Sequence, residues 1–288
     1  MFRNHSPEEV SHTNTQEIMD LALFLAGLTE VPLDSGIIVP SENVKRAIFG
    51  VDIETADLLL ARELGADMVI AHHPGTGPQS VNGYKVMERQ FELLLKAGVP
   101  IERAQKAVKQ GMDARARDKH SRNWDRVAAA ARLLKMPMMN IHIPIDILSE
   151  NAVQEHVDRR LNARSSVKDL IAALKEMPEF VGDAADPVVV MGSRDSYTGK
   201  VIIRMAGGIS SCPDGIKAYF DVGIGTIVMM HISEGVLKAV KERGFGNIVV
   251  GGHMRSDSVG INIFIGELEK RGIEVIPMGG VVAPLHRQ

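Results

Sequence analysis

The stretch VKRAIFGVDIETADLLLARELGADMVIAHH, residues 44–73, contains the pattern that decides the fold. An apolar run predicts a strand at 44–53, and the apolar spacing at 55–64 predicts a helix that ends at Gly65. A second apolar run predicts another strand at 67–73. Strands that alternate with helices through tight turns are typical of parallel sheets, so this stretch predicts an α/β protein.

The same plan recurs in the second half of the chain, in VIIRMAGGISSCPDGIKAYFDVGIGTIVMMH (201–231). After each copy comes a strand, a histidine and, four residues later, an acid: MNIHIPID at 139–146 and NIVVGGHMRSD at 247–257. Identity between the copies is weak, so chance similarity of two α/β units remains an alternative. Taken literally, the repeat predicts two similar α/β lobes with mostly parallel sheets that face each other across a cleft.

The remaining segments complete the predicted order of elements. We expect a helical insertion at 101–135, in which two helices flank the loop 111–126. Pro144 is expected to prevent a helix, so that the next helix starts at Ser149-Glu150. Further segments are predicted as helices at 85–98, 163–186, 213–223, 233–244 and 258–272, and as strands at 136–143, 201–206, 226–232, 247–253 and 273–278.

These elements predict a division into two domains. The first α/β lobe would span 18–147 and include the insertion at 101–135. The second part, 148–288, would hold connector helices and the second lobe, and its final strand could return to the first lobe.

Composition excludes several classes of protein. The net charge of −3 argues against a global attraction to nucleic acid or to an anionic membrane. A single cysteine, Cys212, excludes an internal disulfide framework and fits a reducing compartment. The polar start of the chain lacks the core of a signal peptide, and no apolar run is long enough to span a membrane. We therefore expect a cytoplasmic protein without a membrane partner.

Five side chains of metal-ligand type follow predicted strands: His72, His73, Asp146, His253 and Asp257. Open parallel sheets bind ligands at the carboxyl ends of their strands, so these side chains are expected to meet. Imidazole and carboxylate without thiolate suit divalent zinc, manganese or iron. Because a carboxylate can bridge two ions, the set predicts a dinuclear site, which favours hydrolysis.

Each of these motifs also has an ordinary explanation. His72 and His73 could be half-exposed turn residues, and Asp257 could be a common helix-start acid. His142, His231 and Glu234 are candidates for proton transfer, although Ser233-Glu234 fits a plain helix start slightly better. The basic residues of 111–126 could grip a phosphate or a base, but a solvated loop is the preferred interpretation: Arg115, Arg117, His120 and Arg122, with Trp124.

Four segments of the chain resemble the Nif-three-like family, in matching order over about 18–283. These dimetal-binding α/β proteins include members catalogued as type-two GTP cyclohydrolase I. The segments are IAHHP (70–74), HIPID (142–146), MMHISEGVLKAVKERG (229–244) and GGHMRSDSVG (251–260).

The resemblance implies a ligand set and an assembly. Two divalent ions would be bound by His72, His73, Asp146 and His253, with Asp257 at the position of the family's glutamate, and His142 would lie near the site. The resemblance also implies a homo-oligomer, often a hexameric ring. Two features differ from the pattern of that family. Asp257 is one methylene shorter than glutamate, and the insertion at 101–135 is long enough to cover the site.

Together, these features predict a metal-dependent hydrolase of a small nucleotide-like or phosphorylated molecule. GTP cyclohydrolase activity rests on the resemblance alone, because the sequence has neither a guanine-reading motif nor a GxxxxGK[ST] phosphate loop. The alternative is a non-catalytic metal-binding scaffold or regulatory partner.

Overall fold

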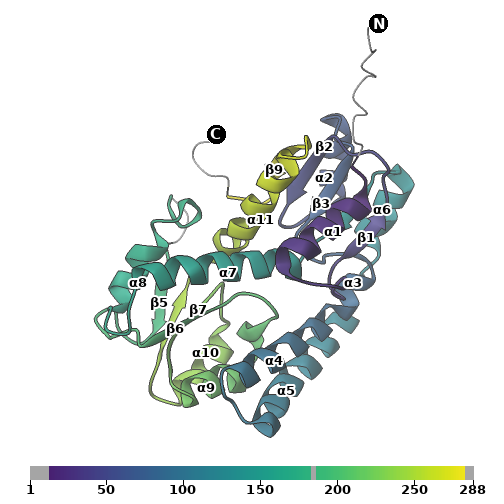
Figure 1. Ribbon diagram of the computed structural model, residues 1–288. Coiled ribbons are helices and arrows are strands. Elements are labelled where there is room, and N and C mark those ends of the chain that lie inside the picture. Colours follow the sequence, from purple (N-terminus) through teal and green to yellow (C-terminus); the bar gives the residue numbers. More distant parts are fainter. Residues whose placement is uncertain (1–12, 183–185, 283–288) are drawn as a thin grey trace, which may run out of the picture.

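The computed structural model describes residues 13–182 and 186–282, which form two sheets with helices around them (Figure 1). The first sheet has the strand order β1-β4-β3-β2-β9, in which β1 is antiparallel to β4 and the other pairs are parallel. Its strands are β1 Gly36–Val39, β2 Arg46–Gly50, β3 Met68–Ala71, β4 Met138–Asn140 and β9 Glu274–Met278.

The second sheet repeats this arrangement with the order β5-β8-β7-β6, and its edge strand β5 is antiparallel to β8. Its strands are β5 Val188–Met191, β6 Lys200–Arg204, β7 Ile224–Met229 and β8 Asn247–Val250. The order β1-β4-β3-β2 therefore recurs element by element, with β9 added beside β2. This confirms the prediction of two similar lobes with mostly parallel sheets.

Helices account for most of the remaining chain. They are α1 Thr15–Ala26, α2 Thr55–Glu63, α3 Gly77–Asn82, α4 Glu88–Lys96, α5 Ile101–His120, α6 Arg126–Leu134, α7 Ile143–Arg160, α8 Val167–Leu174, α9 Pro213–Asp221, α10 Glu234–Lys241 and α11 His253–Glu269, with 3₁₀ turns at Gly83–Met87, Pro178–Phe180 and Ile209–Ser211. Within the described ranges, no helix combines the length and the apolar character needed to cross a membrane.

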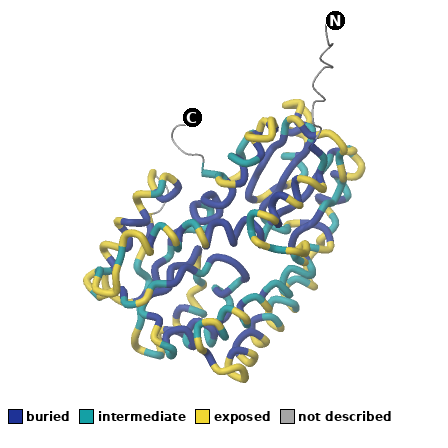
Figure 2. Tube along the Cα trace, viewed as in Figure 1, coloured by how far each residue is buried: buried dark blue, intermediate teal, exposed yellow. Residues whose placement is uncertain are grey.

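Helix α7 runs from one lobe to the other, and α11 packs across it at the centre of the molecule (Figure 1). Near the start of α7, Ile145 packs in the core of the first sheet together with Phe264 of α11. Further along, Val153 packs in the core of the second sheet together with Val259 of α11. Both helices are buried along this crossing, as Figure 2 shows. The two helices therefore join the two cores.

A close contact of backbones sets the distance between α7 and α11. A Cβ atom at Gly260 would lie 2.3 Å from the carbonyl oxygen of Ile145 and 2.6 Å from Oγ of Ser149. The Gly260 N–H donates a hydrogen bond of 2.8 Å to that Ser149 hydroxyl. Only glycine at 260 lets the helices approach this closely.

The two helices predicted at 101–135 are present as α5 and α6, but the loop predicted at 111–126 is too long, because α5 continues without a break to His120 and only 121–125 lie between the helices. The interior glycine of α5, Gly111, lies against the second lobe, where a Cβ would come within 2.7 Å of Met87 and 3.5 Å of the Ser211 carbonyl. Both α4 and α5 pack in one core with α9 of the second sheet. The division at 147/148 stays a prediction, because this shared core links residues on both sides of it.

Two predicted helix starts were also wrong. Helix α7 begins at Ile143, so Pro144 occupies the first turn, where its missing N–H needs no partner. Helix α11 begins at His253 and not at 258, directly after Gly252 with its left-handed φ of 94°. In consequence, His142 and Asp146 lie one turn apart at the start of α7, and His253 and Asp257 lie one turn apart at the start of α11.

We predict that Gly260→Ala lowers the free energy of unfolding by about 1–3 kcal/mol, because the new methyl group forces α7 and α11 apart. Gly235→Ala is the matched control: it is also helical, it has open space around it, and it should stabilise by up to about 1 kcal/mol. Chemical denaturation of both variants measures the difference. Wild-type stability in Gly260→Ala would contradict the close crossing.

Candidate metal centre

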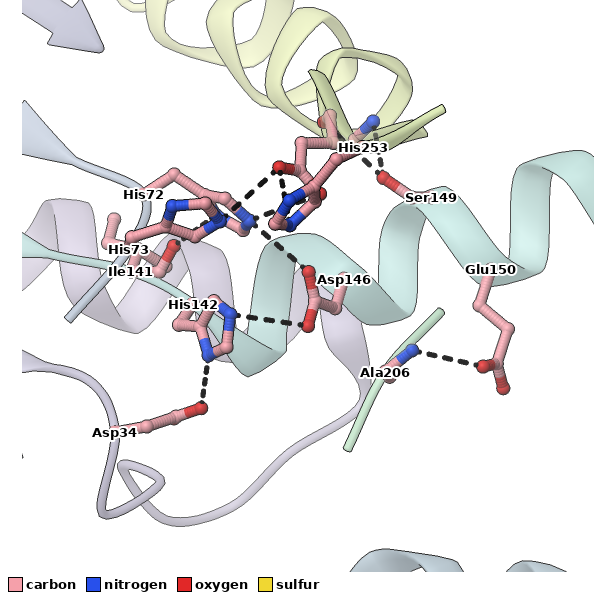
Figure 3. Close-up of polar contacts among 12 residues, drawn as sticks. Asp34, His72, His73, Ile141, His142, Asp146, Ser149, Glu150, Ala206 and His253 are labelled. Atoms are coloured by element: carbon pink, nitrogen blue, oxygen red, sulfur yellow. Dashed lines mark hydrogen bonds and ion pairs between the residues drawn. The ribbon is translucent and has the colours of Figure 1, made fainter. Parts of the chain in front are cut away.

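His72 follows β3 and is fully buried beneath the cleft between the lobes. Its Nδ1 lies 3.0 Å from the carbonyl oxygen of Ile141, which can only accept, so Nδ1 carries a proton. Its Nε2 lies 3.2 Å from Oδ1 of Asp146 and 3.7 Å from Oδ1 of Asp257. Its Nε2 therefore points toward two carboxylates (Figure 3).

His73 and His142 are also oriented by carboxylates, that of the exposed Asp52 and that of the buried Asp34. Nδ1 of His73 lies 2.9 Å from Asp52. Nδ1 of His142 lies 2.5 Å from Asp34 (Figure 3). Their Nε2 atoms turn inward, that of His142 to 3.7 Å from Asp146. A carboxylate behind Nδ1 with Nε2 free is the usual arrangement of a histidine that binds metal.

Asp257 connects the two lobes at the centre of the cluster. Its Oδ1 faces His72, whereas its Oδ2 lies 3.4 Å from Nε2 of His73 and 3.5 Å from Nε2 of His253. Its side chain is completely buried. Each oxygen of this carboxylate thus faces a different set of nitrogens.

Four buried atoms in this cluster have no hydrogen-bond partner: Nε2 of His72, Oδ1 of Asp146, and both carboxylate oxygens of Asp257. Leaving such atoms unpaired in a buried site is costly, and a cation between them removes that cost. Two ligand atoms about 2.1 Å from one ion at a tetrahedral angle lie about 3.4 Å apart. The observed separations of 3.2–3.7 Å match this spacing.

Three overlapping groups of side chains place all their ligand atoms within 4.8 Å of one another, so each could hold a metal ion. They are His72 with Asp146 and Asp257, His73 with His253 and Asp257, and His72 with His73 and His142. All five residues predicted as ligands thus lie together, and His142 joins them.

Charges within the cluster shift its titration. Burial by itself lowers the pKa of His72, but the charges of Asp257 and Asp146 outweigh it and raise that pKa well above its usual value. Burial lowers the pKa of His253 to about 4, so its imidazole is neutral at neutral pH and offers a lone pair. A metal ion must therefore displace a proton from His72, and acid should weaken binding.

A cavity of about 310 Å³ opens beside these residues. His73, His142, Asp146 and His253 line it, together with residues of α5 and of the second sheet. His231 follows β7, lines the same cavity and has its ring 4.6 Å from that of His253. Burial and the charge of Arg115 lower the pKa of His231.

The structure does not bring Glu234 to this cavity, which other residues line. It is the exposed first residue of α10, where Ser233 caps the helix, so the helix-start interpretation applies. Sequence reasoning missed Asp34 and Asp52, the acids behind His142 and His73. Each precedes or follows a strand of the first sheet, but nothing local in the sequence links it to its distant histidine.

The fold and the cluster define an α/β protein with a histidine and aspartate site between two repeated lobes. A scan of protein-family models gave no match, and no curated protein matched the sequence. Solved structures did match. A NIF3 superfamily protein from Sphaerobacter thermophilus is 38% identical, with a TM-score of 0.86 over 93% of this chain and 99% of that one. The chain therefore belongs to the NIF3 superfamily, which confirms the Nif-three-like resemblance.

More distant structures share the fold. Reduced HcgD from Methanocaldococcus jannaschii is 14% identical, with a TM-score of 0.58 over 93% of this chain and 99% of that one. A Bacillus cereus protein related to NIF3 is 12% identical, with a TM-score of 0.54 over 93% of this chain and 97% of that one.

We predict that adding Zn²⁺ or Mn²⁺ raises the melting temperature of the wild type, because the ion binds only the folded cluster. The gain corresponds to about 2.7 kcal/mol when free metal exceeds the Kd a hundredfold. Asp257→Asn should lose most of this gain, since it removes a charge that faces three histidines. Glu234→Gln, outside the cavity, is the control. Equal metal-induced shifts in all three proteins would contradict the assignment.

Proposed function

We propose that this chain binds two divalent metal ions and hydrolyses a small phosphorylated or nucleotide-like molecule. The observation that supports two ions is the placement of Asp257, whose two oxygens face separate nitrogens. One ion would be held by His72, Asp146 and Asp257, and the other by His73, His253 and Asp257. Zinc, manganese and iron(II) all suit this donor set.

Divalent ions supply Lewis-acid chemistry for hydrolysis, because they activate water and stabilise negative charge on the substrate. The chain's own contribution is to hold the ligands in place: Ile141 orients His72, and Asp52 orients His73. Substrate would bind in the adjoining cavity, which at about 310 Å³ fits a small molecule.

His142 is our candidate for proton transfer. Its ring lines the cavity and is 25% exposed, so Nε2 can reach a bound molecule. Behind the ring, Nδ1 is held 2.5 Å from the buried Asp34 carboxylate. An acid in this position keeps the proton on Nδ1 and stabilises the imidazolium when Nε2 takes up a proton.

The function is tested by turnover. Protein loaded with Mn²⁺ or Zn²⁺ is assayed against phosphoesters, nucleotides and cyclic amides, beside His253→Ala and the control Glu234→Gln. We expect hydrolysis by the wild type and by Glu234→Gln, and none by His253→Ala at an unchanged circular-dichroism spectrum. A silent screen alongside stoichiometric metal binding and a tightly bound protein partner would favour the non-catalytic scaffold.

Asp34→Asn tests whether Asp34 acts by orienting His142 and not by contributing to metal binding. We expect kcat to fall by about 10²-fold or more, because the amide no longer stabilises the charged His142 ring. Metal content, measured by mass spectrometry, should stay at the wild-type value, since Asp34 faces His142 from behind. An unchanged kcat and pH–rate profile would remove the role of the Asp34–His142 pair.

From the resemblance we also propose a cytoplasmic homo-oligomer, such as a hexameric ring. Activity of the GTP cyclohydrolase type is supported by the resemblance only.

A further inference from the structure

Helix α5 forms a second, basic wall of the cavity. The cavity is lined by Arg115, Lys119 and Arg122, on or directly after this helix, as well as by the histidines and aspartates. Arg115 and Lys119 are four residues apart and share one face of the helix, and Arg122 follows its last residue, His120. The solvated loop expected for this segment is therefore wrong for Arg115 and Arg122, which line the cavity, whereas Arg117 and His120 are exposed outside it.

Few acids balance this basic wall. The guanidinium of Arg115 donates to the neutral Oγ of Ser211, at 2.8 and 3.0 Å, and Arg122 pairs with Asp118 at 2.9 Å. Over the described part of the chain, the Lys119 ammonium forms no ion pair. The cavity acids Asp34, Asp52 and Asp146 all face histidines. The wall thus presents net positive charge to the cavity.

These cations repel one another, which disfavours their charged forms. Burial lowers the pKa of Lys119, and the charges of Arg122 and Arg115 lower it further. Burial also lowers the pKa of Arg115, again with a contribution from Arg122. Half-buried cations that repel one another gain most from a bound anion, because it replaces lost hydration and cancels the repulsion.

The turn before α9 completes this wall. Gly208, Ile209 and Ser210 line the cavity next to α5. Gly208 adopts a left-handed φ of 71°, and a Cβ there would lie 4.0 Å from Cζ of Arg115. The Arg115–Ser211 bonds fix this turn against the guanidinium. Arg115 therefore contacts the second lobe at both Gly208 and Ser211, so this part of α5 is packed against that lobe.

We propose that Arg115, Lys119 and Arg122 bind the phosphate or polyphosphate group of the substrate, while the scissile bond faces the histidine and aspartate cluster. Arginine and lysine together bind phosphate through charge-assisted hydrogen bonds. This inference deepens the proposed function and rests on it for the reaction, but anion binding itself requires no metal.

The test is calorimetric titration of pyrophosphate into protein freed of metal with a chelator. We expect saturable binding that weakens with added salt, since the contact is ionic. Lys119→Gln should weaken binding by about tenfold or more, the effect of losing one charge-assisted hydrogen bond. Because Lys119 bonds no other described side chain, this variant should fold normally. Trp124, the only tryptophan, lies two residues after Arg122 and gives a second readout by fluorescence.

Arg117→Gln is the matched control, because it removes the same charge from the same helix at an exposed position outside the cavity. It should bind pyrophosphate within about twofold of the wild type. Because binding is measured without metal, it is distinguishable from metal-dependent turnover, and a failure of turnover alone would leave this inference standing. No binding by the metal-free wild type, equal losses in Lys119→Gln and Arg117→Gln, or tighter binding of malonate than of pyrophosphate would overturn the proposal.

Discussion

The close crossing of α7 and α11 is the contact on which the centre of this molecule depends. Gly260 lies against the Ile145 carbonyl and the Ser149 hydroxyl, so nothing larger than hydrogen separates the two backbones. Asp146 and Asp257 lie within one turn of this contact and both point into the buried space beside His72. Two carboxylates so close repel each other, and packing at Gly260 opposes that repulsion until a cation compensates it.

The internal repeat explains why the cluster contains these residues. Each copy ends with a strand followed by a helix whose first turn contributes histidine and aspartate: His142 with Asp146, and His253 with Asp257. The first copy adds His72 and His73 after β3, whereas the equivalent position after β7 supplies His231 at the edge. Two copies of one α/β unit face each other, and this brings together ligand-type residues that are far apart along the chain.

The central strands and the ligand-type residues could be predicted from the sequence, whereas the edge strands, two helix starts and the acids behind the histidines could not. Buried parallel strands such as β3 are continuous apolar runs, so they and the ligand-type residues after them were recognisable. The edge strands β1 and β5 went unpredicted because they are only partly buried, although they are as long as β3. Helix starts were misplaced because Pro144 and Gly252 are compatible with both a turn and a first helical turn. Asp34 could not be found, because it meets His142 across 108 residues.

Asp257 lies in the cluster beside the cavity, and residues of the insertion at 101–135 line that same cavity. A side chain one methylene shorter than the family's glutamate reaches less far, yet Asp257 comes within 3.4–3.7 Å of three histidines because α11 lies so close to α7. The substitution is thus compatible with a two-ion site as long as the glycine contact is kept. The insertion changes the other side: α5 packs in the core of the second lobe and narrows the cleft with basic side chains. The metal-ligand-type side chains and the basic side chains of the cavity therefore come from different elements, so either set can change in sequence without loss of the other.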